Sequence, residues 1–173
     1  SDYITAMCVS ADYGLVFTTR SVHMVSLDKD GTPVVTPMSQ NVGAVGDRAV
    51  TNFEGKTYFF SSTGVFMFDG TTPRPLSSEL NQQVENLPKA FLKDVVAFPD
   101  PEGRRVWFSV CSGNGSENNE VWAIHVDTGA VSKMNASVFD AIRYKDETLV
   151  AFARDAHGPV LPEDERDQPE QGS

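Results

Sequence analysis

Short apolar runs separated by polar turn residues recur along most of the chain. The runs 15–17 and 22–27 lie on either side of a polar turn, and the second run ends at Asp28-Lys29-Asp30-Gly31. The runs are rich in β-branched and aromatic residues, whereas Asp, Gly and Ser interrupt them, as is typical of short strands joined by turns. The same design returns along the chain, so four hairpin units are predicted near 14–31, 48–70, 94–129 and 139–161. These units count as an internal repeat.

The repeat predicts an all-β, mainly antiparallel fold, organised as a partial β-propeller or as propeller-like blades with one short helix. In the third unit, residues 94–98 and 105–110 flank a turn rich in Pro and Gly, which makes them an antiparallel pair. Residues 121–126 extend this pair to a sheet of about three or four strands, the size of one propeller blade. In the fourth unit, residues 148–153 and 159–161 are expected to form the hairpin.

The strands that close the first three units share one register. The residues one and three positions before the closing Asp are apolar in each unit: Leu27 and Val25, Phe68 and Phe66, Val126 and Ile124. A period of two places each pair on one face of its strand. The intervening positions are more mixed. We therefore expect one uniformly apolar face and one mixed face, as in strands stacked between sheets.

One helix is predicted near 78–87, between the second and third units. Its signals are a Ser at the start, apolar residues at helical spacing and a proline at the end: Ser77 or Ser78, then Leu80, Val84 and Leu87, then Pro88. A Ser cap and a terminating Pro are standard helix boundaries. The spacing predicts about three turns.

We interpret residues 1–161 as one β-propeller-like domain and residues 162–173 as a disordered acidic tail. The tail sequence PEDERDQPEQGS contains no aromatic or aliphatic residue. Such a segment cannot bury enough apolar surface to offset the entropy lost on ordering.

Charge and composition exclude several function classes. The 173 residues include 14 Lys and Arg against 24 Asp and Glu, a net charge of −10. A protein that binds duplex DNA by neutralising phosphates should be basic, so no sequence-specific nucleic-acid binding is expected. No apolar run reaches the roughly 20 residues of a membrane span, and no signal peptide is visible at the start. Cys8 and Cys111 each lie in an apolar stretch, which favours small buried side chains over a disulfide.

The candidate chemical motifs have simpler structural interpretations. Asp28-Lys29-Asp30-Gly31 begins like a calcium loop, but the chain continues as a strand, so we expect a hairpin turn. His23, His125 and His157 fall in different units with no shared motif, and no G-x-S-x-G nucleophile elbow is present. The Arg104-Arg105 pair beside Trp107 could stack on a nucleotide base, but the net charge opposes that role. No catalytic, cofactor-binding or metal-binding residue is predicted, and no cofactor.

The pattern between Gly14 and Asn135 resembles a known group of proteins. Four pieces carry the resemblance by their order and spacing: 15–22; 40–50 with 55–70; 75–81; and 98–102 with 106–108, 116–122 and 127–129. They resemble the propeller-like tail proteins of short-tailed bacteriophages, which include packaged-DNA stabilisation and tail nozzle proteins. The resemblance implies a non-enzymatic virion part that forms a ring below the portal, extends the tail channel and retains DNA. Its members are much longer, and these units are too few to close a propeller of about four to eight blades.

Three hypotheses follow, in order of preference. The first is a structural protein of a phage tail nozzle or head–tail connector, located in the virion tail and assembled in the host cytoplasm. Its expected partners are further copies in a cyclic homo-oligomer and neighbouring tail or portal-adaptor proteins, with no membrane span. The second is a propeller-type binding module that recognises a host-surface glycan or protein. The third is a glycosidase that uses carboxylates such as Asp47 and Asp69, which would need to lie about 5–9.5 Å apart in a cleft.

Overall fold

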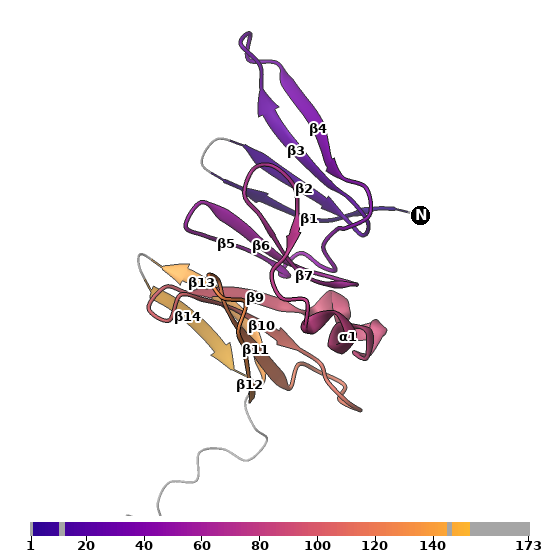
Figure 1. Ribbon diagram of the computed structural model, residues 1–173, viewed down its shortest axis with the longest axis vertical. Coiled ribbons are helices and arrows are strands. Elements are labelled where there is room, and N and C mark those ends of the chain that lie inside the picture. Colours follow the sequence, from indigo (N-terminus) through magenta and orange to yellow (C-terminus); the bar gives the residue numbers. More distant parts are fainter. Residues whose placement is uncertain (1, 11–12, 145–146, 153–173) are drawn as a thin grey trace, which may run out of the picture.

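The computed structural model describes residues 2–10, 13–144 and 147–152. In this part of the chain, the strands form four antiparallel sheets, which we call sheets A to D in chain order (Figure 1). Sheet A contains β1 (Ile4–Val9), β2 (Gly14–Thr18), β3 (Val22–Leu27) and β4 (Pro33–Ser39). Sheet B contains β5 (Val50–Phe53), β6 (Lys56–Ser61), β7 (Gly64–Phe68) and β8 (Arg74–Pro75). Sheet C contains β9 (Val96–Asp100), β10 (Arg105–Val110), β11 (Glu120–His125) and β12 (Val131–Asn135), and sheet D contains β13 (Val138–Tyr144) and β14 (Glu147–Phe152).

The predicted fold class is confirmed: the fold is all-β and antiparallel, and the described residues contain one short α-helix, α1 (Leu80–Glu85). Within each sheet, every strand pairs with the strand next to it in the chain. The hairpins expected within the first three units are β2–β3, β6–β7 and β10–β11, and β9 pairs with β10 as predicted. The described sheets do not close on themselves, and closure into a propeller stays a prediction.

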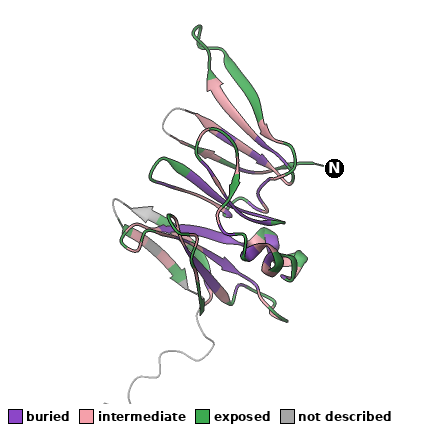
Figure 2. Cartoon of the chain, viewed as in Figure 1, coloured by how far each residue is buried: buried purple, intermediate pink, exposed green. Residues whose placement is uncertain are grey.

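The sheets follow one another face to face, in the order A, B, C, D (Figure 1). A separate apolar cluster fills each of the three junctions, as the buried segments in Figure 2 show. Phe17 of sheet A meets Phe59 of sheet B, with ring centroids 5.0 Å apart, and Phe60 of sheet B meets Trp122 of sheet C at 5.9 Å. The first strands of successive sheets also touch, because β1 contacts β5, β5 contacts β9 and β9 contacts β13.

The predicted register is confirmed in sheets B and C and wrong at the end of sheet A. Phe66, Phe68 and Ile124 are buried. Leu27, by contrast, is 70% exposed. It lies on the face of sheet A that points away from sheet B, where β3 leads into a hairpin with a projecting tip (Figure 1). A strand pattern identifies a shared face, but burial needs a neighbouring sheet, and Leu27 has none.

The helix is shorter than predicted. It spans Leu80–Glu85 with Glu79 at the N-cap, and the N-cap makes no side-chain hydrogen bond. The Ser78 carbonyl instead accepts the Asn81 N–H in a preceding turn, so neither Ser77 nor Ser78 is the N-cap. After Pro88 the chain forms a 3₁₀ helix, Lys89–Asp94. The next strand therefore begins at Val96 and not at residue 94.

In the fourth unit, the structure shows a strand pairing that the sequence did not predict. Strand β14 pairs with the strand before it, β13, from Tyr144↔Glu147 to Val138↔Phe152. Residues 159–161, the expected partner strand, and the tail 162–173 lie outside the described residues.

Candidate functional site

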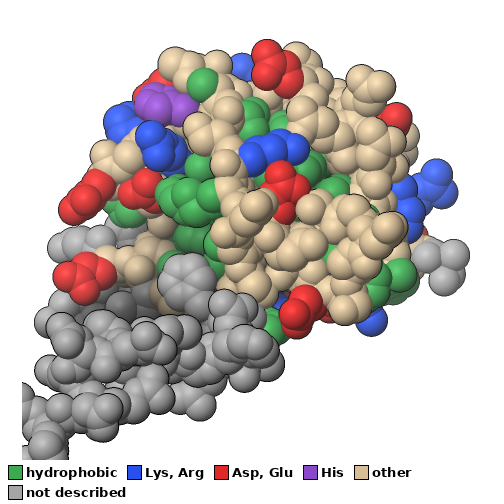
Figure 3. Space-filling view, turned by 90° about the horizontal axis from the view of Figure 1, so that it is seen from below, with side chains coloured by type: hydrophobic (Ala, Val, Ile, Leu, Met, Phe, Trp, Pro, Cys, Tyr) green, Lys and Arg blue, Asp and Glu red, His purple; other side chains and the backbone are tan. Residues whose placement is uncertain are grey.

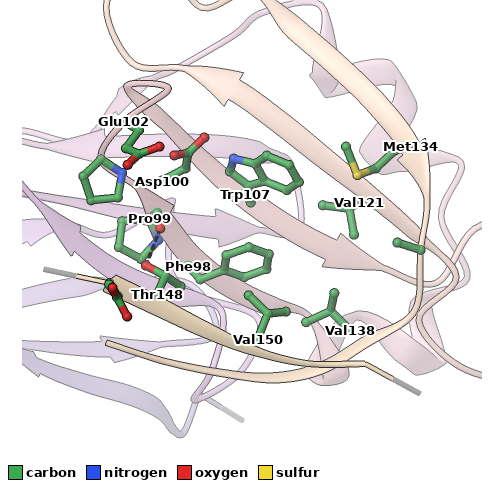
Figure 4. A pocket seen from close by; sticks show the side chains of 13 residues that line it. Phe98, Pro99, Asp100, Glu102, Trp107, Val121, Met134, Val138, Thr148 and Val150 are labelled. Atoms are coloured by element: carbon green, nitrogen blue, oxygen red, sulfur yellow. Dashed lines mark hydrogen bonds between the residues drawn. The ribbon is translucent and has the colours of Figure 1, made fainter. Parts of the chain in front are cut away.

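A groove of about 560 Å³ lies between the outer face of sheet C and the two strands of sheet D. Its floor is apolar and includes Phe98, Trp107, Val121 and Met134, one from each strand of sheet C. Figure 4 shows these side chains in a row across the sheet, with Val138 and Val150 of sheet D opposite them. Trp107 pairs with Phe98 on β9 and with Ala123 on β11, and Val121, two residues before Ala123, pairs with Met134. The four side chains therefore lie on the same face.

The two-residue period explains why sheet C has apolar residues on both faces. Val106, Phe108, Trp122 and Ile124 point to sheet B and belong to the central core cluster. The residues between them, including Trp107 and Val121, point to sheet D and belong to the smaller third cluster. Sheet D is anchored here by the Thr148 hydroxyl, which donates to the Pro99 carbonyl at 2.7 Å. This bond fixes the start of β14 beside the end of β9.

One end of the groove is acidic. Asp100, Glu102 and Glu147 line it, with no Lys or Arg among its described lining residues. Asp100 accepts the Gly103 N–H at 3.0 Å, and none of the three carboxylates forms an ion pair within the described ranges. Figure 3, viewed from this end of the molecule, shows an apolar patch with both acidic and basic side chains around it.

The Trp107 indole N–H is a further polar group at this site. The nitrogen is buried and has no hydrogen-bond partner among the described residues. In Figure 4 it lies on the side of the ring that faces Asp100 and Glu102. The groove therefore combines a wide apolar floor, one free donor and a carboxylate end. This composition suits an elongated ligand that is mostly apolar and positively charged at one end.

The two ends of the sheet stack carry exposed apolar faces. On the outer face of sheet A, Met7 and Val9 are 73% and 78% exposed, and Leu27 and Val35 lie on the same face. On the outer face of sheet D, Ile142 is 66% exposed. At each of the three internal junctions, equivalent sheet faces are buried.

Arg104 joins sheets B and C at their turns. Its guanidinium donates to both carboxylate oxygens of Glu54 and to both of Asp127, at 2.6–3.1 Å. The hydrogen bonds from Arg104 hold the pKa of Asp127 below its ordinary value, and the two carboxylates raise the pKa of Arg104. Arg104 is thus engaged in a structural ion-pair network, and the pair Arg104-Arg105 does not present two free cations beside Trp107.

The other residues singled out in the sequence are dispersed. Asp28 closes the β3–β4 hairpin by accepting the N–H groups of Asp30 and Thr32, so the predicted turn is confirmed. His23 in β3 shares a hydrogen bond with the Ser21 hydroxyl at 2.8 Å, and His125 lies at the end of β11. His157 lies outside the described residues. Both cysteines are free, as predicted, and burial raises the pKa of Cys8 to about 11.

Asp47 and Asp69 lie in separate loops. Asp47 is in the connection between sheets A and B, and its Oδ1 atom lies 4.0 Å from Nε of Arg48. Asp69 follows β7 and accepts from the Thr71 hydroxyl, a bond that lowers the pKa of Asp69. Neither residue lines the groove between sheets C and D. Within the described ranges, no group of three or more His, Cys, Asp and Glu residues could hold a metal ion, and no helix could span a membrane.

Sequence reasoning missed the groove. It identified the strands but did not assign their two apolar faces to different neighbours. The available signal was in residues 95–98 and 106–110, where apolar residues occupy both odd and even positions. Both faces of these strands are therefore apolar, and each face requires a neighbouring layer. The acidic end could not be found this way, because Glu147 is distant in sequence from Asp100 and Glu102.

The chain is similar to solved structures but matches no family model and no curated sequence. Among solved structures, it is similar to a mutant of the Synechocystis apocarotenoid oxygenase, with 10% identity and a TM-score of 0.44, over 86% of this chain and 44% of that one. A chimera of apocarotenoid oxygenase and RPE65 gives 9% identity and a TM-score of 0.43, over 86% and 43%. The chain spans less than half the length of these proteins. Likeness at this level carries no conclusion about activity, and neither protein is a phage tail component.

Proposed function

We propose that this chain is a non-enzymatic structural protein of a phage virion, a tail nozzle or head–tail connector component that lines or closes the DNA channel. In this proposal it works by assembly into a cyclic homo-oligomer that contacts neighbouring tail or portal-adaptor proteins. The observation that carries the assembly is the exposed apolar outer face of sheet A, with Met7, Val9, Leu27 and Val35. The virion setting comes from the resemblance of the sequence to phage tail proteins.

The internal junctions supply the physical argument for assembly. Each of the three junctions buries an apolar sheet face against the next sheet in the chain. The outer face of sheet A corresponds to the faces that sheets B and C bury against the sheets before them. The outer face of sheet D, with Ile142, corresponds to the face that sheet A buries against sheet B. Packing sheet D of one copy on sheet A of the next would repeat the internal junction, and such contacts form closed cyclic assemblies when the rotation closes.

The net charge of −10 is compatible with a channel role. A negatively charged lumen repels the DNA phosphates and so allows packaged DNA to slide without adhering. Exposed apolar sheet faces of this kind are uncommon on proteins that act as monomers, because they promote association.

The second candidate is a binding module that recognises a host-surface glycan or protein. The groove between sheets C and D favours it, because Trp107 offers an apolar ring and a free N–H in one cavity. This candidate expects saturable binding by a monomer, whereas the first expects self-association.

The test is the native mass of the chain by light scattering across a concentration series. From a monomer mass of 18.9 kDa, we expect a discrete multiple that dissociates on dilution. Val9→Asp on sheet A and Ile142→Asp on sheet D should each yield monomers, because each places a charge in the junction. Gln82→Asp on the exposed side of α1 is the matched control and should retain the assembly.

Mixing the two variants gives the sharpest result. The Val9→Asp chain keeps an intact sheet D face and the Ile142→Asp chain keeps an intact sheet A face, so the mixture should form a dimer through one native junction. A monomer for the unaltered chain at every concentration would refute the assembly proposal. Unchanged masses for both single variants would refute the assignment of these faces.

A further inference from the structure

The groove lies beside a strand edge that has no neighbour in the described part of the chain. Sheets A, B and C each have four strands, whereas sheet D has β13 and β14 alone. Glu147, Thr148 and Val150 of β14 line one side of the groove, and Met134 of β12 lines the other. The cavity therefore occupies the region over sheet C where a third strand of sheet D would lie. An unpaired strand edge presents a row of free N–H and C=O groups.

The outermost strands of sheets A and B are protected from pairing in a way that β14 is not. Strand β4 contains Pro33 and Pro37, and β8 consists of Arg74 and Pro75 alone. Proline has no N–H and so interrupts pairing at a sheet edge. Strand β14 has the sequence ETLVAF over six residues, with no proline. Its edge can accept a further strand along its whole length.

We propose that this groove binds one extended segment of a partner polypeptide, which pairs with β14 as a third strand of sheet D. Alternate side chains of the segment would lie on Trp107, Val121 and Met134, and its backbone would satisfy the edge of β14. Strand addition of this type combines main-chain hydrogen bonds for affinity with pockets for alternate side chains for specificity. This site is separate from the outer faces of sheets A and D, so it does not depend on self-association.

Charge defines the chemistry and direction of the segment. Asp100 and Glu102 lie near the start of β14, where Glu147 is located, because Thr148 is bonded to Pro99. Every strand pair in the described sheets is antiparallel. An antiparallel segment on β14 brings its C-terminal end to these carboxylates. The partner should therefore carry alternating apolar residues followed by Lys or Arg.

The acidic tail of this chain does not have that chemistry. Residues 162–173 contain five Asp and Glu residues, one Arg and no apolar side chain larger than proline. Their charge has the same sign as that of Asp100, Glu102 and Glu147. The expected partner strand 159–161 offers three residues, the first of them a proline, to an edge of six. A longer basic, apolar strand from a partner fits the groove better.

The experiment selects peptides from a displayed library of random decapeptides on the full-length chain. The best peptide is then synthesised, and its Kd is measured by the change in tryptophan fluorescence and by calorimetry. We expect enrichment of alternating apolar residues with a Lys or Arg near the C-terminal end. Moving that basic residue to the N-terminal end of the peptide should weaken binding about tenfold, since the charge pairs are then lost.

Variants of the chain locate the site. The double change Glu102→Gln and Glu147→Gln should weaken the selected peptide about tenfold, and Met134→Glu should abolish binding by placing a charge on the apolar floor. Glu117→Gln, an exposed residue of the β10–β11 loop, is the matched control and should leave the Kd unchanged. The glutamine changes are on exposed or rim side chains and preserve the fold, so a loss of binding cannot come from unfolding.

Three results would overturn the proposal. One is a library that yields no peptide whose binding depends on Met134. A second is selected peptides with no preference for a basic C-terminal end. The third is slow hydrogen exchange, unchanged by peptide, at those β14 amides of the free full-length chain that point away from β13. This would show that the outer edge is already paired by the chain itself.

Discussion

Replacing Phe66 by alanine tests the junction between sheets A and B most directly. Phe66 is 8% exposed on β7, and its ring is stacked on that of Phe59 with centroids 5.8 Å apart. Transfer of a buried Phe side chain to water costs about 1.5–3 kcal/mol. The cavity left in a packed core raises the total cost of Phe→Ala to about 3–5 kcal/mol. We expect a loss near 4 kcal/mol, since nearly the whole ring is buried.

The free energy of unfolding is measured by guanidinium chloride titration, followed by circular dichroism and by tryptophan fluorescence. Both tryptophans lie in sheet C, so fluorescence reports a sheet beyond the junction between sheets A and B, whereas circular dichroism reports every sheet. Coincident transitions would show that the stack unfolds as one unit. For a chain of this size, a loss of 4 kcal/mol corresponds to a fall in Tm of about 8–16 °C.

Leu27→Ala is the matched control, because the sequence register places Leu27 in the same position as Phe68 and the structure leaves it 70% exposed. Surface substitutions change stability by about 0.5 kcal/mol or less. The measurement is made at a concentration where the chain is monomeric. A loss below about 1 kcal/mol for Phe66→Ala, or an equal loss for both variants, would refute the arrangement of sheets A and B.

Three further changes have definite expected outcomes. Gly43→Ala should destabilise the chain by about 1–3 kcal/mol in thermal unfolding, because a Cβ at this position overlaps the backbone at Thr18; a stable variant would contradict that close approach. Asp127→Asn should lower the free energy of unfolding at pH 7, because the hydrogen bonds from Arg104 depress the pKa of Asp127. This contribution is present above the ordinary pKa of 3.8 and is lost as the pH falls below it. A stability difference between the two chains that stays undiminished at pH 2 would contradict this role of Asp127. Cys8, with its pKa raised to about 11 by burial, should react with iodoacetamide at pH 8 about a hundredfold more slowly than an exposed cysteine, measured by mass spectrometry; equal rates would show that the thiol is not buried.

The strands could be predicted from the sequence because their signals are local. Period-two spacing and turn residues identify β6–β7 and β10–β11 correctly, and Asp28 forms the expected turn. The helix was predicted too long because the spacing of Leu80, Val84 and Leu87 fits a helix, but Leu87 is buried from the turn that follows α1. Spacing alone does not distinguish a third helical turn from a turn that packs in the same place.

The candidate site could not be predicted because it depends on which sheet covers which face. In the sequence, Trp107 is a strand residue next to a basic pair. In the structure, its side chain faces sheet D, and Arg104 binds Glu54 and Asp127. The charged residues that line the groove with Trp107 are Asp100, Glu102 and Glu147, all acidic, which does not favour the nucleotide-stacking alternative. The partner of β14 was also missed, since β13 had no clear apolar alternation to set it apart from a loop.

The strand order within each sheet has a consequence for how the chain folds during synthesis. Because every strand pairs with its immediate neighbour in sequence, no sheet has to wait for a distant segment. Such local contacts lower the loop-closure entropy of each step and favour rapid folding. Sheet A can form once residue 39 has left the ribosome, and each later sheet then condenses on a surface that already exists. Each sheet would act as the template on which the next sheet of the stack forms.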